Sequence, residues 1–410
     1  MSVKPWVIGL TGPFGSGCSL AAKYLEHERG FTLVKLSKAL GDKWKELNPG
    51  ASDTPRSDLQ ALGDEMRKEK GRHVLAEIGI AKVAPETEKI VVDGIRNPGE
   101  VDWLRLEFGY RFTLIAVLAP PTVRWDRIGA LSYLDKGLSI EDFGEDDRRD
   151  SKEDVKFGQH VTACIDQADI LIDNSEIKQG VFKQKILDYV DLALGSRPRP
   201  AQSWEILMNM AYSAAHSSKC LKRHVGAVVV DAGGKVVGVG YNENPIGTKP
   251  CMEEPKYQFK CYRDIVRNEF LNDYSNRKIQ CPVCGKPLER QEGPPWHCKS
   301  CLDSGKKTAL DDLFFPDRAM NWCTAIHAEV WALFAAGERA NGGELYTTTF
   351  PCFQCAEKIK HNGILTVWYT EAYPDPFSRI RLELAGVTLR QFDGVRSSSF
   401  EKIFAVNRPT

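Results

Sequence analysis

Two short segments near the carboxyl end place the strongest constraint on how this chain can fold. Residues 327–329 read His-Ala-Glu at the start of an apolar stretch, and residues 351–355 read Pro-Cys-Phe-Gln-Cys. Pro351 suits the first turn of a helix, and Cys352 and Cys355, three residues apart, then project from one side of its amino-terminal end. That end of a helix favours thiolate over thiol. A fold that uses these groups must bring the two segments together.

The spacing of His327 and Glu329 indicates that they act from a helix end. Two residues apart, they differ by roughly 200° around an ideal helix and cannot share a face in its interior. A zinc ion held by His327, Cys352 and Cys355 would have three protein ligands and an open position for water, as catalytic zinc does. Glu329 would then be free to move protons. The alternative is a structural site, either a zinc knuckle or a buried histidine beside two core cysteines. Neither form of that alternative gives Glu329 a role.

Length and composition are those of a soluble protein with two cores. The chain has 410 residues, 42% of them apolar, and its 55 Lys and Arg balance its 55 Asp and Glu. The amino-terminal apolar run is too short for a secretion signal, and no stretch approaches the roughly 18 apolar residues of a membrane span. We therefore expect a cytoplasmic protein without a membrane partner, whose closely spaced cysteines bind metal rather than form disulfides. Zero net charge argues against broad attraction to nucleic acid.

Two α/β domains are expected, with limits 1–195 and 196–410. The segment 194–204 places Gly, Ser and two prolines between helical patterns, so we set the junction near Ser196. Apolar strands alternate with amphipathic helices in the first domain, which predicts a parallel sheet wrapped by helices. The second domain begins with a hairpin of two Val-rich strands and continues as an α/β/α layer structure. The predicted strands lie at 6–10, 89–95, 111–119, 226–242 (the hairpin), 344–350 and 363–370.

A second metal site is indicated by two Cys-x-x-Cys pairs in a predicted insertion at about residues 278–304. The pairs flank a Gly/Pro-containing loop, which is typical of a zinc ribbon. Four thiolates complete a tetrahedral zinc, so this site should be structural and should help to fold an insertion with little apolar core. A ribbon that binds nucleic acid is the alternative. The four ligands would be Cys281, Cys284, Cys298 and Cys301. The spacing of other nearby cysteines identifies no site: Cys251, Cys261 and Cys323.

A glycine-rich loop follows the first predicted strand and opens a helix. Residues 12–19 fit Gly-x-x-x-x-Gly-Lys-Ser/Thr except that Cys18 stands in place of the lysine. Backbone amides at the helix terminus could still cradle a nucleotide phosphate, and Ser19 could face Mg²⁺. The positive charge at the β- and γ-phosphates is missing, so the loop predicts binding rather than phosphoryl transfer. The predicted phosphate-binding residues are Gly12, Gly15, Gly17 and Ser19.

The His-x-Glu and Pro-Cys-x-x-Cys segments together match the pattern of zinc-dependent nucleobase deaminases. Residues 203–390 resemble the deoxycytidylate deaminases over a long, ordered stretch. This resemblance implies hydrolysis at C4 of cytosine with Glu329 as the proton carrier, Asn242 bound to the sugar, and Tyr373 closing the nucleotide pocket. The family usually has Gly after that Asn, whereas this chain has Glu243; this departure argues against an inherited allosteric nucleotide site.

A basic run before the hairpin is a candidate for binding the 5′-phosphate or triphosphate. Clustered cations recognise phosphate, although a solvated surface is the alternative. The run comprises Lys219, Lys222, Arg223 and His224.

The amino-terminal half resembles P-loop nucleotide and dephospho-coenzyme-A kinases over most of residues 5–190. The resemblance rests on "IVVDGIRNPGEVDWL", "APPTVRWDRI" and "ADILIDNS" in addition to the glycine-rich loop. It implies that Asp93 is the acidic residue at a strand end and that Arg124 and Arg127 lie on the lid side.

Nearly the whole chain resembles the bacterial antiphage dCTP/dCMP deaminases, which join a degenerate P-loop kinase-like domain to a deoxycytidylate deaminase domain. This implies conversion of dCTP and/or dCMP to dUTP or dUMP and ammonia, depletion of deoxycytidine nucleotides during infection, an inactive resting state and homo-oligomers. The kinase-like domain would then be regulatory and respond to a nucleotide or an RNA.

Two other functions remain open from the sequence. One is a bifunctional pyrimidine salvage kinase and deaminase. The other is a nucleic-acid cytidine deaminase or RNA-binding protein that docks through the ribbon. The sequence does not distinguish dCTP from dCMP, and it does not identify the activating trigger or the number of subunits.

Overall fold

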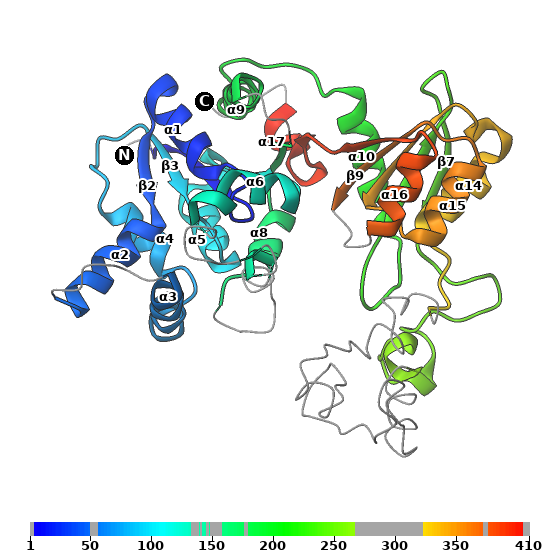
Figure 1. The fold of residues 1–410 in the computed structure, drawn as a ribbon, viewed down its shortest axis with the longest axis horizontal. Helices are drawn as coiled ribbons and strands as arrows, with labels where there is room; N and C mark the ends of the chain where they lie inside the picture. Colours follow the sequence, from blue (N-terminus) through cyan, green and yellow to red (C-terminus); the bar gives the residue numbers. More distant parts are fainter. Residues whose placement is uncertain are drawn as a thin grey trace. The chain divides into compact units, whose positions relative to one another are not determined.

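The chain was analysed as a computed structural model, which divides into two compact units. The first unit comprises Met1–Asn209 with Gln391–Thr410, and the second comprises Met210–Arg390. Each contains one β-sheet with helices packed on it (Figure 1). Within the described part of the chain, no helix is long and apolar enough to cross a membrane. The described residues are 4–49, 56–132, 139, 142–144, 147, 158–175, 179–266, 323–371 and 376–404.

The first unit is built on a six-stranded sheet with the order β11-β5-β4-β1-β3-β2. All neighbouring strands are parallel except β11, which runs antiparallel to β5. Every residue of β4 is buried, as expected for a parallel strand covered on both faces. The predicted parallel sheet is confirmed. Its strands are β1 (Trp6–Thr11), β2 (Thr32–Lys35), β3 (Lys89–Asp93), β4 (Phe112–Leu118), β5 (Ile170–Asp173) and β11 (Gly394–Val395). Its helices include α1 (Cys18–Arg29), α2 (Leu36–Leu47), α3 (Arg56–Lys70), α4 (Val74–Ala81), α5 (Pro98–Phe108), α6 (Pro121–Ser132), α8 (Val161–Asp166), α9 (Gln179–Leu194) and α17 (Phe400–Phe404).

The carboxyl-terminal segment returns to the first unit. Gly394 pairs with Leu171, and Val395 pairs with Ile170 of β5. The indole Nε1 of Trp204 also donates to the carbonyl of Asp393 at 3.0 Å. The compact units therefore differ from the predicted limits 1–195 and 196–410, which remain a prediction about functional domains. A two-residue strand has no periodicity to detect in a sequence, so only the tertiary pairing reveals it.

The second unit is built on a five-stranded sheet with the order β10-β9-β8-β6-β7. The predicted hairpin is confirmed as the antiparallel pair β6 and β7, and β6 also pairs with β8. Strand β9 lies parallel to β8, as a crossover through a helix requires. The strands are β6 (Gly226–Val230), β7 (Val236–Tyr241), β8 (Glu344–Thr349), β9 (Thr366–Glu371) and β10 (Thr388–Gln391). The helices include α10 (Ser203–Ala215), α14 (Ala328–Ala336), α15 (Phe353–His361) and α16 (Pro376–Leu384).

Helices α10 and α14 pack on opposite faces of this sheet, and each contacts a strand closely where that strand has a glycine. A Cβ added to Gly226 would lie 1.9 Å from the Ala211 carbonyl oxygen of α10, and one added to Gly238 would lie 2.1 Å from the Ala332 carbonyl oxygen of α14. Gly238 pairs with Val229, three residues along β6 from Gly226, so the two glycines present opposite faces. These close approaches give the three-layer α/β/α order and hold α14 against the strands.

We expect Gly238→Ala to destabilise the second unit by about 1–3 kcal/mol, because the helix backbone must move away from the strand to admit the methyl group. Urea unfolding of the full chain measures this. Gly41→Ala is the control, because an added Cβ at this position in α2 meets no atom within 4 Å, and alanine is the better helix former. Equal stability of Gly238→Ala and the parent chain would contradict the close contact.

Candidate active site

His327 and Glu329 lie at the amino-terminal end of α14. His327 is the N-cap, with extended backbone at φ −72° and ψ 153°, and its carbonyl accepts the N–H groups of Val330 and Trp331 at 3.1 Å each. Glu329 is in the first turn and is 4% exposed. The predicted position of the pair at a helix end is confirmed. Because His327 has extended backbone and only Glu329 is helical, the separation of roughly 200° that applies inside a helix does not apply to this pair.

A short backbone bridge fixes the segment that leads into His327. Ile326 and Glu243 exchange both backbone hydrogen bonds, at 2.8 Å and 3.2 Å. The Asn244 side chain also donates to the Thr324 hydroxyl at 3.0 Å. Glu243, the residue that replaces glycine of the related family, thus joins the end of β7 to the start of α14 through its backbone.

Cys352 and Cys355 lie at the amino-terminal end of α15. Cys352 is its N-cap, and its carbonyl accepts the Ala356 N–H at 2.9 Å. Pro351 precedes the cap and does not occupy the first turn, so the helix begins later than predicted. This difference changes the site little. Cys352 projects from extended backbone and Cys355 from the first helical turn, so both residues still lie at the amino-terminal end of α15.

One imidazole nitrogen of His327 lies close to both sulfurs. Its Nδ1 is 3.2 Å from Cys355 Sγ and 3.3 Å from Cys352 Sγ. One ligand atom from each of the three residues lies within 4.8 Å of the others. Zinc bonds of about 2.05 Å to nitrogen and about 2.3 Å to sulfur would set a tetrahedral N to S separation of about 3.6 Å. The three donors therefore fit zinc if the distances from Nδ1 to the two sulfurs increase by a few tenths of an ångström.

The protonation of the cluster also suits a metal. Hydrogen bonding from Cys355 lowers the pKa of Cys352 to about 4 against the opposing effect of burial, and His327 adds to the lowering. The Cys352 side chain is thus a thiolate at neutral pH. Cys355, which donates to Cys352, has a pKa raised well above its usual value. Metal binding would release the Cys355 proton and satisfy both sulfurs.

Glu329 is placed to carry a proton beside the three donors. Burial raises its pKa above the ordinary carboxyl value, with the charge of His327 acting in the opposite direction. Its carboxyl group is also hydrogen-bonded with Cys355. A buried carboxyl with a raised pKa accepts and holds a proton more readily than an exposed one, which suits a proton carrier.

These groups share a pocket of about 310 Å³ in the second unit. His327, Glu329 and Cys352 line it, together with Thr349 and Phe350 at the end of β8. The volume is of the size that small-molecule sites have. A small molecule bound in this pocket would therefore lie next to the candidate metal ligands and the proton carrier.

Asn242, predicted to contact a sugar, lines the same pocket and is nearly buried. Its Oδ1 accepts the Val225 N–H at 2.8 Å, and its Nδ2 donates to the Arg223 carbonyl at 2.9 Å. An amide has two donor hydrogens and two acceptor lone pairs. Asn242 can thus hold the segment before β6 and still offer a donor to a ligand, and its contact with a sugar remains a prediction.

Only part of the predicted basic run reaches this pocket. Lys222 and Arg223 line it, as does Arg263, which the sequence pattern did not identify. Lys219 instead pairs with Glu253 at 2.6 Å. His224 is exposed, and its ring contacts the Cys220 carbonyl at 3.0 Å. Arg263 could not be found from the sequence, because it lies in a helical segment outside the motif and is brought to the pocket by tertiary folding.

The glycine-rich loop of the first unit has the shape of a phosphate cradle. It connects β1 to α1, and Gly12, Gly15 and Gly17 all have positive φ, at 155°, 82° and 114°. The Ser19 hydroxyl donates to Asp93 Oδ2 at 2.8 Å. Ser19 and Asp93, predicted from separate segments, are thus brought together at the carboxyl ends of adjacent parallel strands.

Cys18 gives this loop no positive charge. Burial raises the pKa of its thiol to about 12, and the neighbouring Asp93 adds to the shift. The thiol is therefore neutral where the matching motif has an ammonium group.

The two predicted lid-side arginines hold the loop backbone. Arg124 donates to the Phe14 carbonyl at 3.0 Å and pairs with Asp147 at 2.7 Å. Arg127 donates to the carbonyls of Asn174 at 2.7 Å and Ser16 at 3.5 Å.

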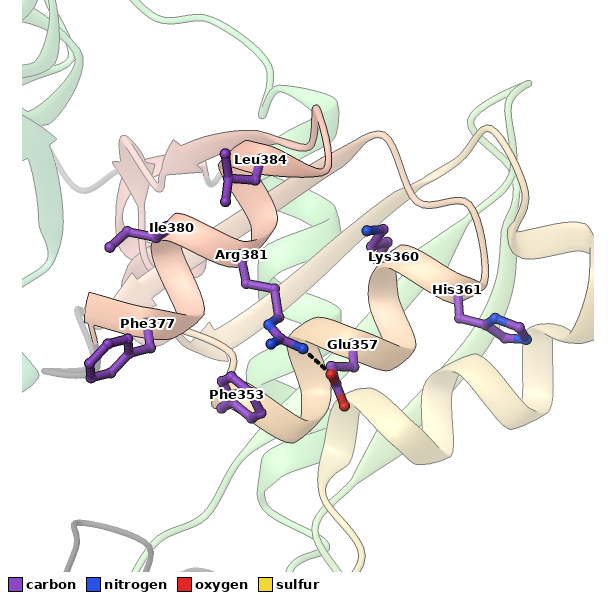
Figure 2. Close-up of a pocket in the computed structure, with 8 residues that line it drawn as sticks. All are labelled: Phe353, Glu357, Lys360, His361, Phe377, Ile380, Arg381 and Leu384. Atoms are coloured by element: carbon purple, nitrogen blue, oxygen red, sulfur yellow. Dashed lines mark hydrogen bonds and ion pairs between the residues drawn. The ribbon is translucent and has the colours of Figure 1, made fainter.

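A more open hollow lies on the outer surface between α15 and α16 (Figure 2). Phe377, Ile380 and Leu384 project from α16 and are at least half exposed, and Arg381 pairs with Glu357 of α15. The hollow is distinct from the pocket that holds Glu329, and its lining lacks the metal-binding donor set.

Five predicted site residues lie outside the described part of the chain and remain predictions. They are Tyr373 of the nucleotide pocket and the ribbon ligands Cys281, Cys284, Cys298 and Cys301.

Comparison with known families matches both halves of the chain. Residues 201–371 match the "cytidine and deoxycytidylate deaminase zinc-binding region", and residues 8–155 match an AAA domain. The matched deaminase region contains His327, Glu329, Cys352 and Cys355. It also spans the described pocket, so the family match and the geometry identify the same site.

Individual relatives agree with this division. A deoxycytidylate deaminase of Schizosaccharomyces pombe is 28% identical over 402 residues, which cover 96% of this chain and 99% of that protein. A deoxycytidylate deaminase of Saccharomyces cerevisiae is 29% identical over 212 residues, 51% of this chain and 50% of that protein. A UPF0200 protein of Thermococcus onnurineus is 30% identical over 192 residues, 46% of this chain and 98% of that protein. The chain belongs to the UPF0200 family over those residues, and it joins a kinase-like AAA domain to a cytidine and deoxycytidylate deaminase domain.

Proposed function

We propose that this protein deaminates deoxycytidine 5′-nucleotides, dCMP and/or dCTP, to the deoxyuridine nucleotide and ammonia. The observation that carries the proposal is the buried carboxyl of Glu329 beside three metal-ligand donors, two of which, His327 and Cys352, line the same pocket as Glu329. Two relatives are deoxycytidylate deaminases, which supports deoxycytidine 5′-monophosphate as a substrate.

The residues of the pocket have separate roles in this reaction. A zinc ion held by His327, Cys352 and Cys355 would supply an acidified water as the nucleophile. Glu329 would take one proton from that water and deliver it to N3 of the cytosine ring as the oxygen bonds to C4. It would then move the remaining hydroxyl proton to the amino group, so that the C4–N bond breaks and ammonia leaves. Burial raises the pKa of this carboxyl above its usual value, so Glu329 holds a proton more readily than an exposed carboxyl does.

Phosphate recognition would come from the cationic side of the pocket. Lys222, Arg223 and Arg263 line it, and guanidinium groups bind phosphate through paired hydrogen bonds. Asn242 would orient the sugar, and Tyr373 would help to close the site. These roles predict that a nucleotide is preferred to the free nucleoside.

Release of ammonia from purified protein tests the function. The substrates are dCMP, dCTP, CTP, deoxycytidine and single-stranded DNA, each supplied separately. We expect rapid release from dCMP or dCTP. Preferential release from single-stranded DNA would instead support a nucleic-acid deaminase, and release from none of them by zinc-loaded protein would contradict the proposal. Light scattering of the same sample tests the predicted homo-oligomer.

The amino-terminal domain would control the deaminase in response to a phosphate-bearing ligand, and it would not act as a kinase. The glycine cradle and the Ser19–Asp93 contact support ligand binding, with Mg²⁺ as a companion ion. The neutral Cys18 thiol argues against phosphoryl transfer. Such control needs a ligand whose affinity differs between the active and resting states. In this proposal the protein depletes deoxycytidine nucleotides in phage-infected cells.

We expect Gly17→Val to alter this control without changing the chemistry of deamination. Gly17 has φ 114°, and an added Cβ would lie 2.5 Å from Asn174 Nδ2, so valine must distort the loop. Cellular dCTP is measured with and without phage challenge, alongside deamination by the purified variant. Gly180→Ala is the control, because an added Cβ there meets no atom within 4 Å. If Gly17→Val responds to phage as the parent does, the loop is not the regulatory input.

A further inference from the structure

The cationic side of the active-site pocket carries a carboxylate beside its positive groups. Lys222, Arg223 and Arg263 line the pocket, and the proposed function assigns them to the nucleotide phosphate. The Nζ atom of Lys222 lies 2.5 Å from Oδ2 of Asp264. Asp264 is not itself a lining residue, so it acts on a bound nucleotide from just outside the cations that it accompanies.

Asp264 lies between two of the three cations. Its Oδ2 atom contacts Lys222, and its other oxygen, Oδ1, lies 3.8 Å from Nε of Arg263. The backbone holds the residue in place, because the N–H groups of Asp264 and Ile265 donate to the Cys261 carbonyl at 2.9 Å and 3.1 Å. The carboxylate therefore belongs to a helical turn, residues 262–266, which keeps it beside Lys222.

This carboxylate lies toward the solvent-exposed end of the site. The side chains of Lys222 and Asp264 are 48% and 35% exposed, whereas Glu329, beside the metal-ligand donors, is buried. A cytosine next to Glu329 would therefore direct its 5′ end toward the exposed pair. The pocket volume of about 310 Å³ is near the lower limit for small-molecule sites, so the β- and γ-phosphates of a triphosphate would extend beyond it.

The charges at this end match one phosphate group better than three. Asp264 offsets one of the three positive charges, so two remain for the ligand. A phosphate monoester carries about −1.5 to −2 at neutral pH, which these two charges balance. A triphosphate carries about two further negative charges, and they would meet the carboxylate of Asp264. Placing like charges together is a general means of rejecting a competing ligand.

We propose that Asp264 is a specificity-determining residue, which makes the pocket select the monophosphate dCMP over the triphosphate dCTP. The inference rests on the proposed deamination of deoxycytidine nucleotides and adds which of the two is preferred. Asp264 repels the β- and γ-phosphates, and it occupies the Lys222 ammonium that would otherwise bind them. It takes no part in the proton transfers at the base.

A second ion pair of the same chemistry provides a comparison. Lys219 and Glu253 pair at 2.6 Å, and they connect the same two segments of the chain as Lys222 and Asp264, before β6 and between β7 and α14. Neither lines the active-site pocket. If these pairs only held the two segments together, loss of either carboxylate would have the same effect on both nucleotides. Selection by charge requires an effect of Asp264 alone.

Steady-state deamination of dCMP and dCTP by the zinc-loaded full chain tests the selection. We expect kcat/KM of the parent to be at least tenfold higher for dCMP. Asp264→Asn keeps the side-chain volume and removes the charge, so the preference for dCMP should fall by about tenfold, through a lower KM for dCTP and not through kcat. Asp264→Glu, which restores the charge, and Glu253→Gln, the matched control, should keep the preference of the parent. A nucleotide bound to the first unit would affect all four proteins alike.

Ionic strength gives a second test that needs no variant to fold. The Debye length falls from about 10 Å at 0.1 M salt to about 3 Å at 1 M, so the preference of the parent for dCMP should shrink several-fold at 1 M. An equal preference in Asp264→Asn and the parent, or faster turnover of dCTP than of dCMP by the parent, would overturn the role of Asp264. If the zinc-loaded parent deaminated neither nucleotide, the proposed function itself would be wrong, and this inference with it.

Discussion

Glu329→Ala will lose deamination by about 10⁴-fold while retaining the same zinc content as the parent protein. General acid–base catalysis commonly contributes about 10²–10⁴-fold, and the upper end applies because one carboxyl group serves successive proton transfers. Glu329 is buried beside the His327, Cys352 and Cys355 donors but is not one of the three. Turnover of dCMP and dCTP and zinc content are measured on the same sample.

The control for this change is Glu338→Ala, which removes an exposed carboxyl from the turn after α14. It should retain full activity. Glu329→Gln separates proton transfer from packing, because it keeps the side-chain volume and loses the acid–base group. Activity of Glu329→Gln within a few fold of the parent would eliminate Glu329 as the proton carrier.

Cys352→Ala will lose both deamination and one zinc ion per chain. The substitution leaves two of the three donors, and it removes the side chain that is a thiolate at neutral pH, since its pKa is lowered to about 4. Two protein ligands are fewer than a catalytic zinc site has. Deamination should fall by at least the 10⁴-fold expected for Glu329→Ala, because the nucleophile is no longer activated.

Zinc analysis of Cys352→Ala and Glu329→Ala together distinguishes the two roles. Cys164→Ala serves as the control for loss of a buried thiol and should retain the parent's zinc and activity. If Cys352→Ala kept its full zinc content, the metal would be held elsewhere, and the three-donor site would be wrong even if activity were lost.

Short-range chemistry explains what could be predicted from the sequence. Strands and helices follow from hydrophobic periods of two and 3.6 residues, which act over a few neighbours. His327, Glu329, Cys352 and Cys355 were identifiable because each motif sits within one turn of a helix end, where backbone geometry alone sets the direction of the side chains. Within these two motifs, the start of α15 was misplaced, since Pro351 is compatible with positions on both sides of the cap.

Contacts between distant segments were decided by the tertiary structure. Pairing of β6 with both β7 and β8 brings the helix ends of α14 and α15 together, and the same sheet places Arg263 and Cys220 at the pocket. The return of Gly394–Val395 to β5 likewise depends on a partner more than two hundred residues away.

The amino-acid sequence by itself determined the chemistry of the deaminase motif, the alternating α/β order of both halves, and the absence of a lysine from the glycine-rich loop. The tertiary fold was needed to show which cations face the pocket and how Asn242 holds the segment before β6. The reason is physical: local motifs are fixed by backbone geometry over one or two turns, whereas a side chain's neighbours across the fold depend on sheet pairing and packing that no local spacing encodes.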